Sequence, residues 1–149
     1  MNAITSKTWP DVTADDFFDI VRLRTEVFYV EQRIDEPDFD ELDRDPATVH
    51  LWISDDAGCA AYLRIVELPS PEMGASRSFG RVAVRADRRG EGLARLLVHR
   101  VIEDHGHEAM TIHAQEYVAQ LYADYGFEVV GGRYFEAGLP HLMMVRKAT

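Results

Sequence analysis

The residues best suited to chemistry in this chain form a turn between a strand-like segment and a helix. Residues 81–85 are rich in β-branched side chains, and the basic turn after them contains Gly90 and Gly92. The first backbone N–H groups of a helix have no partner within it and carry the positive end of its dipole. A phosphate would satisfy several of these donors at once, and glycine lets a ligand approach the backbone closely. The turn therefore predicts an anion-binding site.

Two other phosphate-binding motifs do not fit this turn. A Walker loop ends in Gly-Lys followed by Ser or Thr, and a dinucleotide-binding turn needs a third glycine and an acidic residue after the next strand. Neither pattern occurs here. For this segment alone, a plain strand-to-helix turn without a ligand remains the alternative.

Composition limits the classes of protein that the chain can represent. Its 149 residues, 46% hydrophobic and 28% charged, predict one globular domain over residues 1–149. A net charge of −10 argues against nucleic-acid binding, which needs Lys and Arg to neutralise phosphates. No apolar run is long enough to cross a membrane, and residues 1–7 lack the apolar core of a signal peptide. The lone Cys59 excludes an internal disulfide, and we expect a cytoplasmic location.

Charge is unevenly distributed along the chain. Residues 11–45 contain 13 acidic residues and four arginines, whereas residues 81–100 contain six arginines and two acidic residues. One region would attract cations and the other anions, as expected if a cationic amine meets an anionic cofactor. A solvated acidic loop without a binding role explains the first region equally well.

Hydrophobic periodicity and turn residues predict alternating strands and helices. We expect strands over residues 3–9, 49–54, 59–68, 79–85, 110–114, 127–135 and 142–146. We expect helices from Thr13 to about Val30, from Leu93 to Gly106 and over residues 116–125. Residues 32–46, which contain two prolines, are predicted to form a loop or a short irregular helix, and residues 68–77, with Pro69 and Pro71, are predicted to form a second loop. The resulting fold class is α/β, in the order β-α-β-β-β-α-β-α-β-β.

Two motifs in this order resemble those of the GNAT acetyltransferase superfamily. One is Arg89-Gly90-Glu91-Gly92-Leu93-Ala94, and the other is Tyr122-Ala123-Asp124-Tyr125-Gly126-Phe127. Residues 23–32, 41–45 with His50, 114–115 and 134–144 extend the resemblance, which is closest to the ElaA-like members of that superfamily. Two positions depart from the pattern: Ala137 replaces an aspartate, and Ala94 fills the last small position of the turn.

The resemblance implies a mixed sheet, splayed at its centre and flanked by helices, with acetyl-CoA between the splayed strands. The implied cofactor-binding residues are Val82, Ala83, Val84, Arg88, Arg89, Gly90, Glu91, Gly92, Leu93, Ala94, Arg95, Gln115 and Tyr122. Among them, the N–H groups of the turn would hold the pyrophosphate, and the N–H of Val84 would stabilise the oxyanion that develops on the thioester.

The implied activity is N-acetyl transfer by direct attack of a primary amine on acetyl-CoA, without a cysteine nucleophile. Tyr122 is the candidate acid for the departing thiolate, because a phenol is protonated at neutral pH. Candidate bases are Glu31, Glu41, Asp43, Glu136 and His141, and candidate acceptor-binding residues are Arg24, Glu31, Gln32, Glu41, Asp43 and His141. Alternatively, His141 is a buried residue that joins the C-terminal hairpin to the first helix, and Glu31 and Gln32 organise the acidic loop. No spacing of ligands predicts a metal site.

Other functions stay open at this stage. A non-catalytic acetyl-CoA sensor or regulatory interaction module would share the cofactor motifs, and a purely structural domain would not bind acetyl-CoA at all. The acceptor could be a polyamine, an aminoglycoside, an amino acid or a protein lysine. We expect no nucleic-acid or membrane partner, and either a monomer or a homodimer.

Overall fold

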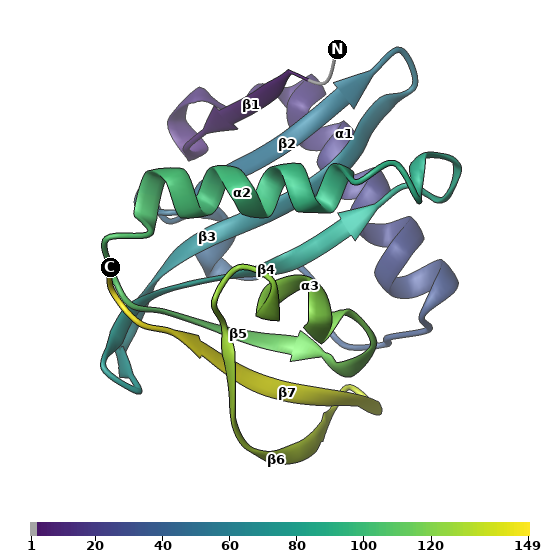
Figure 1. The fold of residues 1–149 in the computed structure, drawn as a ribbon. Coiled ribbons are helices and arrows are strands. Elements are labelled where there is room, and N and C mark those ends of the chain that lie inside the picture. Colours follow the sequence, from purple (N-terminus) through teal and green to yellow (C-terminus); the bar gives the residue numbers. More distant parts are fainter. Residues whose placement is uncertain (1–2) are drawn as a thin grey trace.

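The computed structural model describes residues 3–149, which form a mixed seven-stranded sheet with helices on both faces (Figure 1). The strand order is β1-β2-β3-β4-β5-β7-β6, and only the β4–β5 pair is parallel. The strands are β1 (Ile4–Lys7), β2 (Val49–Asp55), β3 (Gly58–Glu72), β4 (Ala75–Val84), β5 (Met110–Gln115), β6 (Glu128–Glu136) and β7 (Leu139–Arg146). The predicted α/β class and the order of elements are confirmed.

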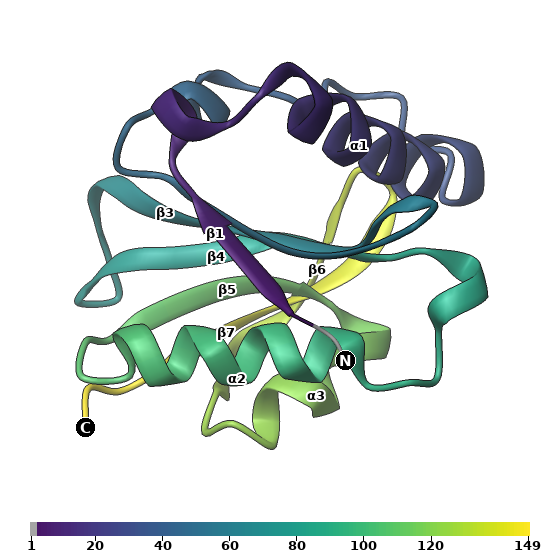
Figure 2. The same ribbon diagram turned by 90° about the horizontal axis from the view of Figure 1, so that it is seen from above.

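The helices are α1 (Ala14–Arg24), α2 (Leu93–His105) and α3 (Ala119–Ala123). Figure 2 shows α1 over one face of the sheet and α2 with α3 over the other. The start of α1 follows from a capping box in which Thr13 and Asp16 bond each other's backbone N–H groups. The helix continues as a π-helical turn, Thr25–Glu31, so the first predicted helix is real but changes its hydrogen bonding half-way.

An extra residue in β4 explains why the sheet opens at its centre. Tyr62 and Arg64 of β3 pair with Ala83 and Gly80 of β4. One residue of β3 lies between these two pairs, but two residues of β4 do, so β4 contains one extra residue. This β-bulge places Arg81 at a φ of +54°. Pairing with β5 is confined to Arg77–Met110 and Ser78–Thr111, and the two strands then diverge (Figure 1).

The prediction of a loop over residues 68–77 is wrong. β3 runs on to Glu72, β4 begins at Ala75, and the tight turn between them uses positive φ at Met73 and Gly74. The two prolines that suggested a loop lie where the β3–β4 register is interrupted, between Glu67 and Glu72. Proline is tolerated there because no regular ladder of hydrogen bonds needs its missing N–H.

Each face of the sheet has its own hydrophobic core. The α2 and α3 face buries a large cluster that includes Leu63, Leu97, Ile112 and Phe127. The α1 face buries a smaller cluster that includes Ile20, Leu23, Trp52 and Tyr62. No helix within residues 3–149 is long and apolar enough to span a membrane.

Candidate active site

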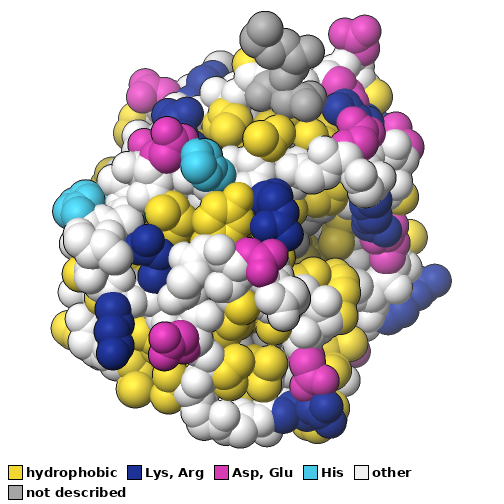
Figure 3. Space-filling model, viewed as in Figure 1, with side chains coloured by type: hydrophobic (Ala, Val, Ile, Leu, Met, Phe, Trp, Pro, Cys, Tyr) yellow, Lys and Arg dark blue, Asp and Glu magenta, His cyan; other side chains and the backbone are white. Residues whose placement is uncertain are grey.

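A cavity of about 1240 Å³ lies where β4 and β5 separate. Its lining comes from both strands, the end of the first helix, residues 34–38, α3 and the β6–β7 turn. On the face that carries α2 and α3, Figure 3 shows a hollow with hydrophobic side chains in it. The divergence of the strands therefore gives one cavity access to both faces of the sheet.

The turn after β4 has the properties of an anion site. Within residues 3–149, no backbone N–H of residues 90–95 is hydrogen-bonded to any group. Gly90 and Gly92 have φ values of +82° and +79°, which explains why glycine stands at both positions. A Cβ at either one would have nothing within 4 Å, so space for a ligand is open beside the backbone. Gly92 caps α2, and its neighbours are the N–H groups at the positive end of that helix.

The three arginines predicted at the turn differ in what they bind. Arg88 contacts Asp55 at 2.7 Å and Glu91 at 2.9 Å, and Arg95 contacts Asp124 at 3.1 Å. Arg89 donates to the Val84 carbonyl at 3.0 Å and to Glu31 at 2.5 Å. Of the three arginines, Arg89 lines the cavity, and it ties the end of the first helix to the end of β4.

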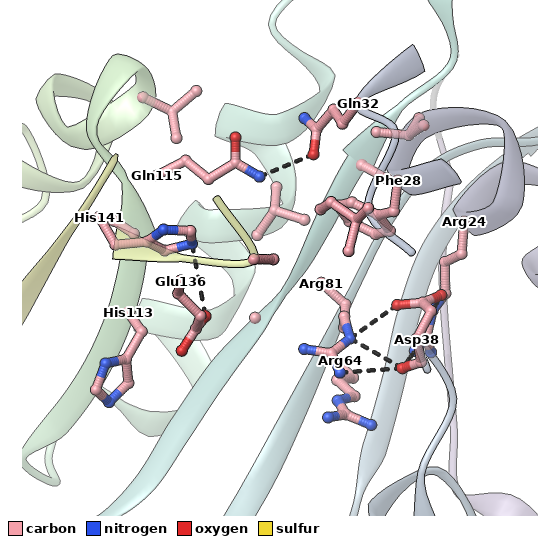
Figure 4. Close-up of a pocket in the computed structure, with 18 of the residues that line it drawn as sticks. Arg24, Phe28, Gln32, Asp38, Arg64, Arg81, His113, Gln115, Glu136 and His141 are labelled. Carbon is pink, nitrogen blue, oxygen red and sulfur yellow. Dashed lines mark hydrogen bonds and ion pairs between the residues drawn. The ribbon is translucent and has the colours of Figure 1, made fainter. Parts of the chain in front are cut away.

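Other predicted cofactor residues divide into two groups. Val82, Ala83, Val84, Ala94, Gln115 and Tyr122 line the cavity. Gly90, Glu91 and Gly92 form the turn beside it, and Leu93 is buried in the core and offers only its backbone. Gln115 donates to Gln32 at 2.9 Å, so these two residues bridge the open end between β5 and the first helix (Figure 4).

Tyr122 lies on α3 with its ring in the core and lines the cavity. The ring is 2% exposed and packs edge-on against Phe79, with 5.8 Å between centroids. Within the described part of the chain, its hydroxyl has no hydrogen-bond partner. Burial raises the pKa of this hydroxyl, so it carries its proton at neutral pH.

The three aspartates of the acidic loop over residues 38–43 are paired with arginines. Buried Arg24 contacts Asp43 at 2.7 Å and Asp38 at 2.9 Å. Arg64 contacts Asp40 at 2.7 Å and Asp43 at 3.0 Å. Burial opposes the charge of Asp43, but the hydrogen bond and charge of Arg24 and the charge of Arg64 outweigh it, and the pKa of Asp43 is lowered. These carboxylates are neutralised within the fold.

Two predicted bases are therefore misplaced for proton removal. Asp43 is buried in its arginine pairs, and Glu41 is exposed and bound to Arg44 at 2.9 Å. Neither lines the cavity, so neither is retained as a base or an acceptor ligand. Arg24 lines the cavity but its side chain is completely buried and paired, which fits a supporting role for the loop.

His141 and Glu136 lie together on the β6–β7 hairpin, on the side of the cavity away from Arg81 and Asp38 (Figure 4). Nδ1 of His141 donates to the Leu139 carbonyl at 2.8 Å, because a carbonyl oxygen can only accept. Its Nε2 lies 3.6 Å from a Glu136 oxygen. His141 is thus fixed within its own hairpin and not to α1, and its Nε2 can accept a proton beside a carboxylate.

Sequence reasoning missed a second polar group on the same side of the cavity. His113 Nδ1 accepts from the Tyr134 hydroxyl at 2.5 Å, and its Nε2 donates to Glu72 at 3.0 Å. The Tyr134 ring lies 5.8 Å from that of His141. The alternation of β5 could have indicated His113, since it lies two residues before Gln115 and therefore shares its face. Glu72 could not be found because it was assigned to a loop.

Comparison with known proteins decides the family. The model of the acetyltransferase (GNAT) domain matches residues 48–148. The chain belongs to the GNAT family. Its sequence is 31% identical over 150 residues to a UPF0039 protein of Mycobacterium tuberculosis, covering 98% of this chain and 94% of the relative.

Solved structures place this GNAT chain among the ElaA-like members. A crystal structure of an acyl-CoA N-acyltransferase from Pseudomonas aeruginosa has a TM-score of 0.86 and 32% identity, covering 98% of this chain and 99% of that one. Escherichia coli ElaA has a TM-score of 0.87 and 26% identity, covering 99% and 100%. The predicted resemblance is confirmed, and the GNAT fold is one that binds acyl-CoA.

Proposed function

We propose that this GNAT protein is an N-acetyltransferase that moves the acetyl group of acetyl-CoA to a primary amine by direct attack. The observation that carries the proposal is the row of backbone N–H groups over residues 90–95 that have no partner in the described part of the chain, next to a cavity where β4 and β5 diverge. A pyrophosphate suits such donors at a helix start.

The strand edge of β4 supplies the second part of the binding site. Beyond Ser78, β4 has no pairing with β5, so the backbone of residues 82–84 has no strand partner on that side. The amides of a pantetheine chain would pair there as an added strand. Arg89, which also lines the cavity, would meet a phosphate oxygen if it exchanged Glu31 for the ligand.

Acetyl-CoA supplies a thioester, whose acyl carbon an amine attacks to give an amide and the CoA thiol. The backbone N–H of Val84 would stabilise the oxyanion that develops during attack. Tyr122 would give its proton to the departing thiolate, since burial keeps the hydroxyl protonated and it lines the cavity. Cys59 does not enter this scheme, because it is buried and burial with nearby Asp19 raises the pKa of its thiol to about 12.

His141 is our candidate for the base. An incoming ammonium must lose a proton before attack, and Nε2 of His141 has a lone pair available while Nδ1 is bound to the Leu139 carbonyl. The Glu136 carboxylate, 3.6 Å away, would stabilise the imidazolium that results. Together the two residues bind the ammonium and accept its proton.

The test is an assay of CoA thiol release with acetyl-CoA and a panel of primary amines. We expect acceptor-dependent release, with propionyl-CoA and butyryl-CoA as poorer donors. Thermal melting with acetyl-CoA alone is measured in parallel, because a bound ligand raises the melting temperature. A rise in melting temperature without release from any amine would favour the non-catalytic sensor instead.

A further inference from the structure

Arg81 is a charged residue of the cavity that the proposed reaction does not use. It lines the cavity from the β-bulge, at a φ of +54°. A non-glycine residue is disfavoured in this region, whereas the adjacent Gly80 could adopt it freely. The bulge therefore holds an arginine side chain in the lining of the cavity at an energetic cost.

The guanidinium of Arg81 is fixed on one side and open on the other. Its Nε lies 2.9 Å from an Asp38 carboxylate oxygen, and Nε and NH2 donate to the Asp38 carbonyl at 3.1 and 3.0 Å. Its NH1 makes no hydrogen bond to any group of residues 3–149. Figure 4 shows NH1 directed away from Asp38, toward the side of the cavity that holds Glu136 and His141. The side chain is 33% exposed, so a ligand can reach it.

The cavity thus presents an open guanidinium nitrogen on one side and a carboxylate with an imidazole on the other. Arg81 offers NH1 as a charged donor from β4, and Glu136 with His141 offers a carboxylate and a proton acceptor from the β6–β7 hairpin. Asp38, Asp40 and Asp43 are shared among Arg24, Arg64 and Arg81, while Glu31, Asp35 and Glu36 also line the cavity. An anionic group on a ligand would therefore find a partner at NH1.

We infer that the acetyl acceptor is an amine that also carries a carboxylate, as a free amino acid does, with the carboxylate on Arg81 and the amine at Glu136 and His141. This inference rests on the proposed function and names its substrate class. A polyamine brings a second positive charge toward Arg81, and a lysine side chain carries no carboxylate of its own, so either leaves NH1 without an acceptor. An amino acid has a carboxylate for Arg81 and an amine for Glu136 and His141. These two contacts hold it in one orientation, with its amine toward the base.

Matched acceptor pairs test the inference on the unmodified protein. Several amino acids of different side chain are each compared with the amine that lacks the carboxylate and with the methyl ester, by kcat/KM for CoA release. We expect a preference of about tenfold or more for the carboxylate form, mostly in KM, since a charge-assisted hydrogen bond is lost in the others. Equal or better turnover of the amines without a carboxylate overturns the inference but leaves the proposed function intact. Absence of release from every acceptor defeats the proposed function itself, and this inference with it.

A variant locates the effect at Arg81. Arg81→Asn removes the charge, and asparagine tolerates positive φ. We expect the preference for carboxylate acceptors to disappear, with little change for the decarboxylated amines. Arg44→Gln, an exposed arginine outside the cavity, serves as the matched control and should keep the preference. A folded Arg81→Asn protein, checked by its melting curve, that still prefers the carboxylate form would overturn the assignment.

Discussion

The acidic loop over residues 38–43 and the turn over residues 90–95 are both dense in polar groups, but they differ in whether those groups have partners. In the loop, Arg24, Arg64 and Arg81 neutralise three aspartates. In the turn, the backbone N–H groups are left without partners within residues 3–149. Saturated polar groups stabilise a fold, and unsatisfied ones at a cavity indicate a ligand.

The hydroxyl groups of the two buried tyrosines, Tyr62 and Tyr122, differ in the same way: one has hydrogen-bond partners, and the other has none in the part of the chain that the structure describes. Tyr62 donates to His50 at 2.7 Å and lies within 3.3 Å of Arg24, in the same network as the acidic loop. Tyr122 faces the cavity, and its hydroxyl has no such partner among residues 3–149. The same residue type thus serves the fold in one place and is available for chemistry in the other.

Removing a charge from the loop should have the largest effect, and it should fall on stability. Asp43→Asn leaves buried Arg24 and Arg64 without their shared counter-charge, so we expect the free energy of unfolding to drop by about 3 kcal/mol. Urea denaturation measures it. Exposed Glu41→Gln is the control and should change stability by less than about 0.5 kcal/mol. Similar stabilities for the two variants would contradict the account of the loop.

Removing the hydroxyl group should affect kcat at Tyr122 and stability at Tyr62. For Tyr122→Phe we expect kcat to fall by about 100-fold with an unchanged melting temperature, because a proton donor is lost and no hydrogen bond to the described residues is broken. Tyr62→Phe should instead lower stability, by about 1–2 kcal/mol, since His50 and Arg24 lose a buried partner. Full kcat in Tyr122→Phe would remove that residue from the mechanism.

The role of the turn in cofactor binding can be tested by comparing two glycines that have the same φ value, one inside the turn and one outside it. Gly92 and Gly74 both have a φ of +79°, and a Cβ at either has nothing within 4 Å. Alanine at each should cost a similar 1 kcal/mol or so of stability. We expect only Gly92→Ala to raise the KM for acetyl-CoA, about tenfold, because its methyl group occupies space beside the N–H groups. An equal KM in both variants would mean that the turn does not touch the cofactor.

Mild acidification should give the smallest effect. The pKa values of Asp40 and Asp43 are lowered in the fold: for Asp40 the hydrogen bond from Arg64 is the largest cause, and for Asp43 the Arg24 and Arg64 interactions outweigh burial. Their stabilisation is complete above the unfolded pKa of about 3.9 and is lost as the pH falls through the lowered values. Between pH 7 and pH 4 we expect a loss of only about a few tenths of a kcal/mol for each group, measured by urea denaturation. A gain in stability over this range would contradict the pairing.

Local patterns in the sequence were enough to predict the order of elements and the position of the turn. The periodicity of the helix after Gly92 and the capping box at Thr13 depend only on residues close together in the sequence, so they can be predicted without a structure. The partners of the acidic loop could not, because Arg64 and Arg81 come from strands 20 or more residues away in the chain. For the same reason the loop looked like a site for cations, and Arg81 was not recognised as a residue of the cavity.

The contrast between the loop and the turn is tested most directly by titrating ¹⁵N-labelled protein with CoA and following the backbone amide resonances. We expect the largest chemical-shift changes at residues 90–95, where Gly90 and Gly92 serve as distinctive reporters. The amide resonances of residues 38–43 should not shift. Shifts confined to the acidic loop, or no shift in the turn at saturating CoA, would contradict the assignment of the turn as the cofactor site.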